Sequence, residues 1–374
     1  MRTFQNFYFL IALLFWSCAK DESRPNSSRT VMVYMAANNN LASDAYTNLN
    51  QMEESFKGID GKLVVYARIF GQTPKLYEVV QDNGPEIRSK VLKTYNEHNS
   101  SDPAVMKMVF EDMKSLAQAD SYGAILWSHA TNWAPADAYG KPKTRSFGDD
   151  NFKSMDVQVL KTALPTELDF LIFDACSMAS VEVLYELRNV TPYILASPTE
   201  VLSVGMPYHQ ISPHLFNKDV KRGLSAVAKA YVAYYETKTG LEKSASFSLV
   251  ATGPLAKVAQ ETRNLLSKNS SFIPRIDRRK IQRLDMDPAS ITPAFDFVDM
   301  LEQNFPGTEL SALKKAVTEA VVFKANTSHF LGTPIVAFSG LSCYIPVKLE
   351  YQLRPFYETL EWSRDAEFYR MFWE

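Results

Sequence analysis

Cysteine is scarce in this chain of 374 residues, which carries it at positions 18, 176 and 343 only. Three cysteines are too few for the disulfide framework that stabilises small secreted domains. The sequence also lacks a glycine-rich phosphate loop, a metal-spaced Cys/His cluster, a G-x-S-x-G element and an internal repeat. It therefore gives no support to a nucleotide-binding, zinc-binding, serine-hydrolase or repeat architecture.

An excess of charge of one sign is also missing. Lysine and arginine total 40 and aspartate and glutamate 42, so the formal net charge is −2 and no nucleic-acid partner is expected. A hydrophobic fraction of 46% with 22% charged residues is typical of a soluble globular protein with a sizeable core. The length fits one large domain or two medium ones.

An apolar run at residues 7–16 follows Arg2 at the N-terminus. It is shorter than the roughly 20 residues that span a bilayer, and it fits the apolar region of a signal peptide. Cys18 follows almost directly and resembles the lipidated cysteine of a bacterial lipoprotein box, which becomes the mature N-terminus. We expect a signal peptide at 1–17 and a polar, lipid-anchored tether at 18–29. An ordinary secretion signal that is cut nearby is the alternative.

Apolar runs alternate with helical patterns after the tether. This order predicts an α/β fold, in which a mostly parallel sheet lies between two layers of helices. The runs are almost wholly apolar, as expected for strands that are covered on both faces. The expected strands are 30–38, 62–70, 122–129, 168–175 and 192–197, and the expected helices are 41–56, 102–119 and 178–188.

The C-terminal third mixes both patterns. Strands are expected at 245–253 and 341–347, and helices at 255–268 and 295–305. Cys343 falls inside the last strand and is interpreted as a core residue. No clear linker precedes this part. We therefore expect a catalytic core at 30–252 and a region at 253–374 that packs on it.

Two predicted core strands end in reactive residues, one in His129 and the other in Cys176. Ligands of open parallel sheets bind beyond the carboxyl ends of the strands, so these side chains are expected to meet there. The predicted helix at 178–188 would favour the thiolate of Cys176, and His129 would carry the proton. The backbone N–H groups of Cys176 and Ala130 would hold an oxyanion. A buried core cysteine and a structural histidine are the alternatives.

Asp174 lies two residues before Cys176, so strand alternation points both side chains the same way. A carboxylate beside a thiol raises the thiol's pKa, so Asp174 is better placed at the base of a substrate pocket. There it would pair with an arginine or lysine of the substrate. The alternative is that Asp174 caps the following helix. The other histidines are interpreted as surface or structural residues: His98, His209, His214 and His329.

These residues lie in motifs that resemble the clostripain-type cysteine peptidases (peptidase family C11), relatives of caspases, gingipains and legumains. The motifs are "TVMVYMAANNNL", "AILWSHATNW" and "LDFLIFDACSMASVEVLYELRNVTPYILASPTE". The spacing from His129 to Cys176 is also close to the roughly 50 residues that separate the catalytic pair of caspases. The resemblance implies a caspase-like α/β/α sandwich and a Cys176/His129 dyad that cleaves after arginine or lysine.

The resemblance implies further residues and properties. Asp174 would be the acid that recognises the basic residue, and Glu200 a second acid of the same pocket. Lys143 and Arg145 would be processing sites in the loop between the two catalytic strands; a solvated basic loop is the alternative. No cofactor is expected to be required, and calcium binding follows from the resemblance alone. We expect a monomer that acts on peptides or proteins at the bacterial cell envelope, anchored to the outer membrane or cell surface, with a secreted or periplasmic form as the alternative.

The sequence departs from the family pattern at Ala130, where the family usually has glycine, and in the less acidic stretch "ASPTEVLSVGMPY". A second hypothesis is therefore a catalytically inactive lipoprotein that binds a peptide or a partner. A third is a hydrolase of small acyl compounds that uses the same dyad.

Mass spectrometry of the mature protein tests the N-terminal interpretation. We expect a lipidated N-terminal Cys18 and, if the loop is processed, a cut after Lys143 or Arg145. A Cys18→Ser variant should lose the lipid and its membrane association. An unlipidated N-terminus at another residue would contradict the anchor and favour plain secretion.

Overall fold

The structure, a computed structural model, describes residues 28–135, 146–269, 276–286, 293–305, 310–345 and 348–370. The predicted signal peptide at 1–17, the lipidation site Cys18, nearly all of the tether, and Lys143 and Arg145 lie outside these residues.

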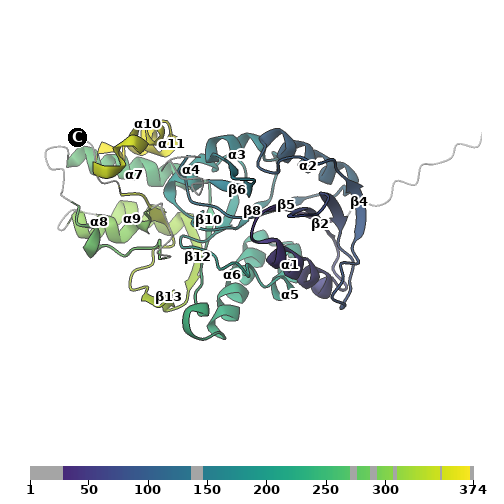
Figure 1. The fold of residues 1–374 in the computed structure, drawn as a ribbon. Helices are drawn as coiled ribbons and strands as arrows, with labels where there is room; N and C mark the ends of the chain where they lie inside the picture. Colours follow the sequence, from purple (N-terminus) through teal and green to yellow (C-terminus); the bar gives the residue numbers. More distant parts are fainter. Residues whose placement is uncertain are drawn as a thin grey trace, which may run out of the picture.

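Within the described residues, a nine-stranded sheet crosses the molecule in the order β12-β10-β9-β8-β5-β1-β2-β3-β4 (Figure 1). The strands from β9 to β2 in this order are parallel, which confirms the predicted parallel centre. The two outer strands on each side pair antiparallel with their neighbours: β3 with β2 and β4 with β3 on one side, and β10 with β9 and β12 with β10 on the other. The bounds are β1 (Thr30–Ala37), β2 (Lys62–Ile69), β3 (Lys75–Glu78), β4 (Lys90–Thr94), β5 (Tyr122–Trp127), β8 (Phe170–Asp174), β9 (Tyr193–Ala196), β10 (Ser246–Ala251) and β12 (Val321–Asn326).

Alternate residues of the central strands pack into two separate hydrophobic cores, one on each face of the sheet. On β1, Met32 and Tyr34 pack into one cluster, whereas Val31 and Val33 pack into the other. All eight residues of β1 are buried. Successive side chains of a strand point to opposite faces, so an unbroken apolar run requires a cover on each face.

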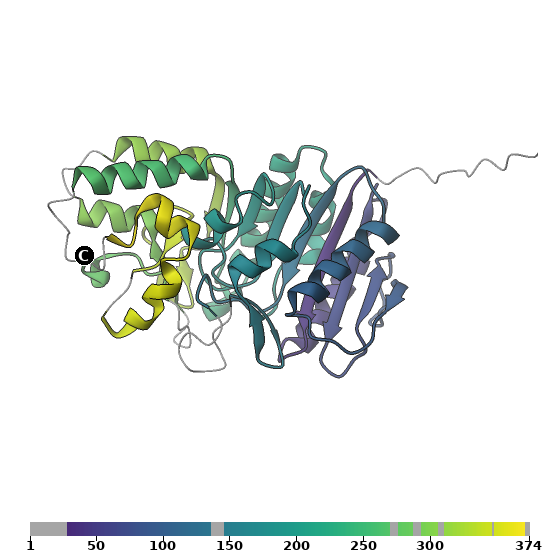
Figure 2. The ribbon, with the colours of Figure 1, turned by 90° about the horizontal axis from the view of Figure 1, so that it is seen from above.

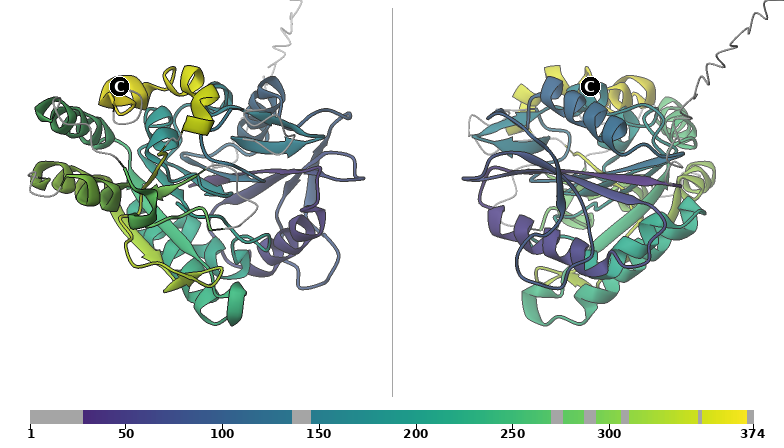
Figure 3. Two further views of the ribbon diagram at one scale, coloured as in Figure 1. Left: turned by 60° about the vertical axis from the view of Figure 1, so that its left-hand side comes forward. Right: turned by 90° about the vertical axis from the view of Figure 1, so that its right-hand side faces the viewer.

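Helices form those two covers, one above and one below the sheet (Figure 3). One layer holds α1 (Ala42–Ser55), α5 (Tyr208–Ile211), η1 (Ser212–Phe216) and α6 (Val220–Glu236). The other holds α2 (Pro103–Leu116), α3 (Val157–Ala163), α4 (Val181–Glu186) and α7 (Leu255–Lys268). The predicted start of α2 is confirmed, because Asp102 accepts a hydrogen bond from Ala104 N and Pro103 occupies the first turn.

The C-terminal region gathers at one end of the molecule (Figure 2). Its strand β12 pairs with β10, so this region continues the main sheet. The predicted strand at 341–347 is too long, because among its described residues, 341–345, only Ser342 and Cys343 form a strand; Cys343 is fully buried, as expected. The remaining elements are β6 (Phe147–Asp150), β7 (Lys153–Met155), η2 (Gly240–Glu242), η3 (Arg278–Lys280), β11 (Phe295–Asp296), α8 (Phe297–Asn304), α9 (Ser311–Ala320), β13 (His329–Phe330), β14 (Thr333–Pro334), β15 (Ser342–Cys343), η4 (Lys348–Leu353), α10 (Arg354–Tyr357) and α11 (Glu361–Ala366).

A buried carboxylate joins α4 to the C-terminal region. Glu182 is fully buried and accepts hydrogen bonds from the backbone N–H of Tyr344 and from the hydroxyl of Tyr357, both at 3.0 Å. Burial raises the pKa of Glu182 to about 7, although these hydrogen bonds act in the opposite direction. The folded protein thus binds a proton at this site more readily than the unfolded chain. Proton binding at Glu182 therefore adds to the free energy of unfolding at acidic pH, and this contribution is lost as the pH rises through about 7.

We expect Glu182→Gln to reduce the fall in the free energy of unfolding between pH 5 and pH 8, because the amide oxygen accepts the same two bonds without a charge. The variant should be more stable than the wild type at pH 8, by on the order of 1–3 kcal/mol. Urea unfolding at both pH values measures this. The exposed Glu111→Gln on α2 is the control. A pH dependence in Glu182→Gln equal to that of the control would contradict the assignment.

Candidate active site

The two reactive side chains leave the sheet at the same edge. Strands β5 and β8 are parallel neighbours, and their last paired residues are Trp127 and Asp174. His129 and Cys176 each follow two residues later. The structure brings both to one cavity of about 280 Å³. The described residues that line it are Leu41, Trp127, Ser128, His129, Asp174, Ala175, Cys176, Glu200, Val201, Leu202, Ser203, Gly205 and Leu331.

Cys176 is held by the loop that follows β9. The backbone N–H of Val201 donates to its sulfur at 3.3 Å, and the thiol lies 3.6 Å from the Val201 carbonyl oxygen, which can accept from S–H. The next residue, Ser177, has a φ of 58° and donates its N–H to Thr199 O at 2.8 Å. The chain therefore turns sharply at the cysteine, and an amide N–H points at the sulfur. A hydrogen bond to the charged form favours the thiolate.

The predicted helix at 178–188 begins later than expected. Its cap is Ser180, whose hydroxyl accepts from Val183 N at 3.2 Å, and α4 spans only six residues. Ala179 N donates to Ser197 O instead of entering the helix. Cys176 thus lies outside the first turn, where a helix dipole is felt. The predicted position of Cys176 directly before the helix is therefore wrong, and the backbone N–H that contacts its sulfur is that of Val201.

Asp174 forms the buried floor of the cavity. Its Oδ2 accepts from the backbone N–H of Met206 at 3.2 Å and from the hydroxyl of Tyr208 at 2.9 Å. Its Oδ1 is buried and has no hydrogen-bond partner among the described residues. Burial raises the pKa of Asp174 to about 6. The alternative that Asp174 caps α4 is wrong, because its partners lie on and before α5 and Ser180 supplies the cap.

Gly205 lets the chain pass close to this carboxylate. Its φ is +70°, and a Cβ there would lie 2.9 Å from Asp174 Oδ2 and 3.1 Å from Asn48 Oδ1. The hydroxyl of Tyr235 donates a hydrogen bond of 2.7 Å to the Gly205 carbonyl oxygen, and Trp127 Nε1 donates to Asn48 Oδ1 at 2.7 Å. Sequence reasoning missed these supports, since each residue type has an ordinary core or turn explanation.

Glu200, the expected second acid, is also among the residues that line the cavity. Its Oε2 accepts from the backbone N–H of Met286 at 3.1 Å. The carboxylate also raises the pKa of Arg283, whose principal partner is Asp285. Glu200 therefore joins the cavity wall to the C-terminal region.

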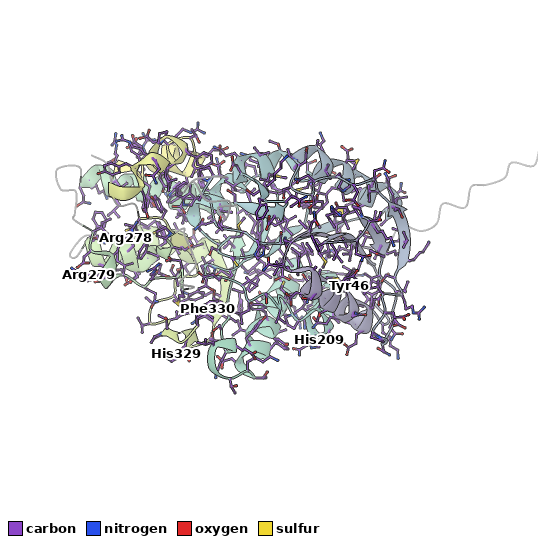
Figure 4. All side chains as sticks on the ribbon, viewed as in Figure 1. Tyr46, His209, Arg278, Arg279, His329 and Phe330 are labelled. Atoms are coloured by element: carbon purple, nitrogen blue, oxygen red, sulfur yellow. The ribbon has the colours of Figure 1, made fainter. Side chains whose placement is uncertain are left out.

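A hairpin of the C-terminal region supplies Leu331, another residue that sequence reasoning missed. It lies between β13 and β14 with a φ of 44°, and its N–H donates to Ser244 Oγ at 2.7 Å. Figure 4 marks this hairpin by His329 and Phe330. Together with Leu41 and Leu202, Leu331 gives the cavity apolar walls above its acidic floor.

Ala130 packs into the hydrophobic core and is 5% exposed. It lies opposite Phe147 of β6 in a non-hydrogen-bonded pair, because the bonds on either side run from Gly148 N to His129 O and from Thr131 N to Ser146 O. Its own N–H therefore points away from β6. Ala130 is not among the described residues that line the cavity, and its side chain packs into the core beside it.

The remaining histidines lie on other elements. His98 shares a hydrogen bond of 2.5 Å with the hydroxyl of Tyr66. His209 is on α5 and His329 on β13, as Figure 4 shows, and His214 is in η1. The described lining of the cavity includes none of the four.

A metal site is not formed by the residues that the structure describes, since they contain no group of three or more His, Cys, Asp or Glu able to hold an ion. The same residues contain no helix with the length and apolarity needed to cross a bilayer.

Comparison with known proteins gives a consistent result. The profile of the clostripain family (Peptidase_C11) matches residues 33–331. The structure is similar to an inactive zymogen of a C11 protease from Parabacteroides distasonis, with a TM-score of 0.79 and 29% identity over 92% of this chain and 99% of the other. It is also similar to a secreted C11 cysteine protease from Bacteroides thetaiotaomicron in complex with an irreversible peptide inhibitor, with a TM-score of 0.78 and 30% identity over 91% and 99%. No curated protein matches the chain.

Proposed function

The chain belongs to the clostripain family and is a cysteine peptidase, and we propose that it cleaves peptide bonds after arginine or lysine with a Cys176/His129 dyad. The observation that supports this most is the position of Asp174, which lines the same cavity as the thiol and the imidazole. A buried carboxylate with an oxygen that lacks a partner among the described residues favours a cationic ligand.

The reaction begins with the transfer of the Cys176 proton to His129. The thiolate attacks the carbonyl carbon of the scissile bond, and the C–N bond breaks as His129 gives the proton to the leaving amine. Water then attacks the thioester with His129 as base, which releases the acid product and restores the thiol. We assign the oxyanion of both tetrahedral intermediates to the backbone N–H groups of Cys176 and Ala130.

Substrate selection begins at the floor of the cavity. A lysine or arginine side chain passes between the apolar walls and brings its charge to Asp174. Glu200, which lines the same cavity, adds a second negative charge. Because the pKa of Asp174 is about 6, its carboxylate is charged at neutral pH and binds the cation there.

Processing and export complete the proposal. The similar protein from Parabacteroides distasonis is described as an inactive zymogen, and we assign cleavage sites after Lys143 and Arg145 to this chain. The Bacteroides thetaiotaomicron protein is described as secreted, and this supports the proposal that the present chain is also exported. We assign its attachment to the cell envelope to a lipid on Cys18. No cofactor is invoked in the reaction.

The inactive-lipoprotein hypothesis was motivated by Ala130 and by the less acidic stretch "ASPTEVLSVGMPY". The side chain of Ala130 packs into the core, so the argument for that hypothesis now rests on the stretch alone.

A lysyl chloromethyl ketone tests the nucleophile. We expect stoichiometric labelling of Cys176 and loss of hydrolysis of a lysine-ended fluorogenic peptide. Cys176→Ala should abolish both the labelling and the hydrolysis. Cys343→Ala is the matched control, because that thiol is fully buried and should be irrelevant to either readout. Hydrolysis by Cys176→Ala at the wild-type rate would contradict the dyad.

Asp174→Asn tests the specificity. The asparagine oxygen can accept the bonds from Met206 and Tyr208, so the fold is retained while the charge is lost. We expect kcat/KM for lysine and arginine peptides to fall roughly 100-fold or more.

The pH dependence gives a second readout for Asp174. In the wild type, the preference for lysine over its uncharged analogue norleucine should fall as the pH drops through about 6, because the carboxylate is then protonated. In Asp174→Asn this preference should be weak at every pH. The exposed Asp120→Asn is the control. An undiminished lysine preference in Asp174→Asn would exclude this role.

A further inference from the structure

A side chain from the neighbouring strand contacts the catalytic histidine. Asn40 follows β1, which is hydrogen-bonded to β5, and its Oδ1 lies 2.8 Å from Nε2 of His129. Because an amide oxygen can only accept, Nε2 is the nitrogen that carries the proton in this bond. This bond favours the tautomer with the proton on Nε2 and restrains the plane of the imidazole ring.

Asn40 is the last residue of a run of three asparagines, and the other two hold the run in place. Asn38 is 7% exposed and donates from Nδ2 to Asp150 Oδ1 at 2.6 Å. Asn39 donates from Nδ2 to the Asp149 carbonyl at 2.8 Å, and its Oδ1 accepts from Leu41 N at 2.9 Å. The loop therefore has a fixed conformation, which places Asn40 at the histidine.

The hairpin strand β6 is the other half of this support. It contains Asp149 and Asp150, which the asparagines contact, and Gly148, whose N–H donates to the His129 carbonyl at 3.0 Å. The buried Asp150 also accepts from Ser100 N at 2.7 Å. One strand thus holds the histidine backbone and the asparagine run together. The supporting contact of Asn38 is buried and that of Asn39 part-buried, while the bond between Asn40 and the ring of His129 is itself exposed.

We propose that Asn40 is a positioning residue for the reaction: its side-chain oxygen holds His129 so that Nδ1 exchanges the proton with Cys176. This role rests on the proposed function of the dyad. When His129 takes the proton from Cys176, the same oxygen stabilises the N–H of the imidazolium. A neutral amide does this without placing a negative charge beside the histidine. The titratable groups that line the cavity with His129 are Asp174, Cys176 and Glu200.

Two substitutions at Asn40 test the proposal with a lysine-ended peptide. Asn40→Ala removes the acceptor, and kcat should fall roughly 10- to 100-fold, by analogy with the loss seen when the partners that orient metal-binding histidines are removed. KM should change little, because Asn40 is not among the described residues that line the cavity. Asn40→Asp restores an acceptor and should recover most of kcat. Asn83→Ala, in an exposed loop, is the control for an asparagine removed elsewhere.

The pH profile separates positioning from a general loss of structure. In Asn40→Asp the added carboxylate raises the pKa of the imidazolium, so the alkaline limb of kcat/KM should move to higher pH. In Asn40→Ala the imidazolium loses its acceptor. The rate of alkylation of Cys176 by iodoacetamide should then show a thiol pKa closer to the ordinary value of about 8.5.

The two readouts also separate this proposal from the proposed function. Alkylation of Cys176, located by peptide mass spectrometry, requires no peptide cleavage. If the wild type cleaves no peptide while Asn40→Ala still shifts the alkylation profile, the peptidase specificity fails and the role of Asn40 stands. If Asn40→Ala keeps the wild-type kcat and the wild-type alkylation profile, the role of Asn40 is overturned. A loss of kcat in Asn40→Asp as large as in Asn40→Ala, without a shifted alkaline limb, would also overturn it.

Discussion

The parallel pairing of β5 with β8 is the constraint on which the site depends. Their register places Trp127 beside Asp174 at the carboxyl edge of the sheet. The chain then leaves both strands on the same side, and His129 and Cys176 reach one cavity. A slip of one residue in this register would turn one set of side chains to the opposite face. The two hydrophobic cores resist such a slip, because each takes every second residue of the central strands.

The cavity combines three physical environments within a small volume. Its floor is the carboxylate of Asp174, whose pKa is raised by burial. A cation that binds there contributes more binding free energy than it would beside an exposed acid. The backbone N–H of Val201 donates to the sulfur of Cys176, and Oδ1 of Asn40 accepts from Nε2 of His129. Gly205 allows the chain to pass beside Asp174 without a clash. The segments that carry these groups are distant in sequence, and the sheet edge is what joins them.

Much of the fold and of the site could be predicted from the sequence. Long apolar runs indicate the parallel strands, and the residues that follow these runs indicate which side chains lie at the carboxyl edge of the sheet. His129, Cys176 and Asp174 were accessible in this way. The supports were not: Asn40 belongs to a polar loop, and Leu331 comes from a hairpin whose strands have two residues each. Such contacts depend on tertiary packing, which local periodicity does not encode. The start of α4 was also missed, since Ala179 pairs with the loop after β9, a partner that sequence cannot show.

The most direct measurement of the central claim is a crystal structure of the protein after reaction with a lysyl chloromethyl ketone. The account predicts a thioether at Cys176 Sγ and the lysine ammonium within hydrogen-bond distance of Asp174. It also predicts that Nε2 of His129 still donates a hydrogen bond to Oδ1 of Asn40. An ammonium directed into solvent, or an adduct on a residue other than Cys176, would contradict the account.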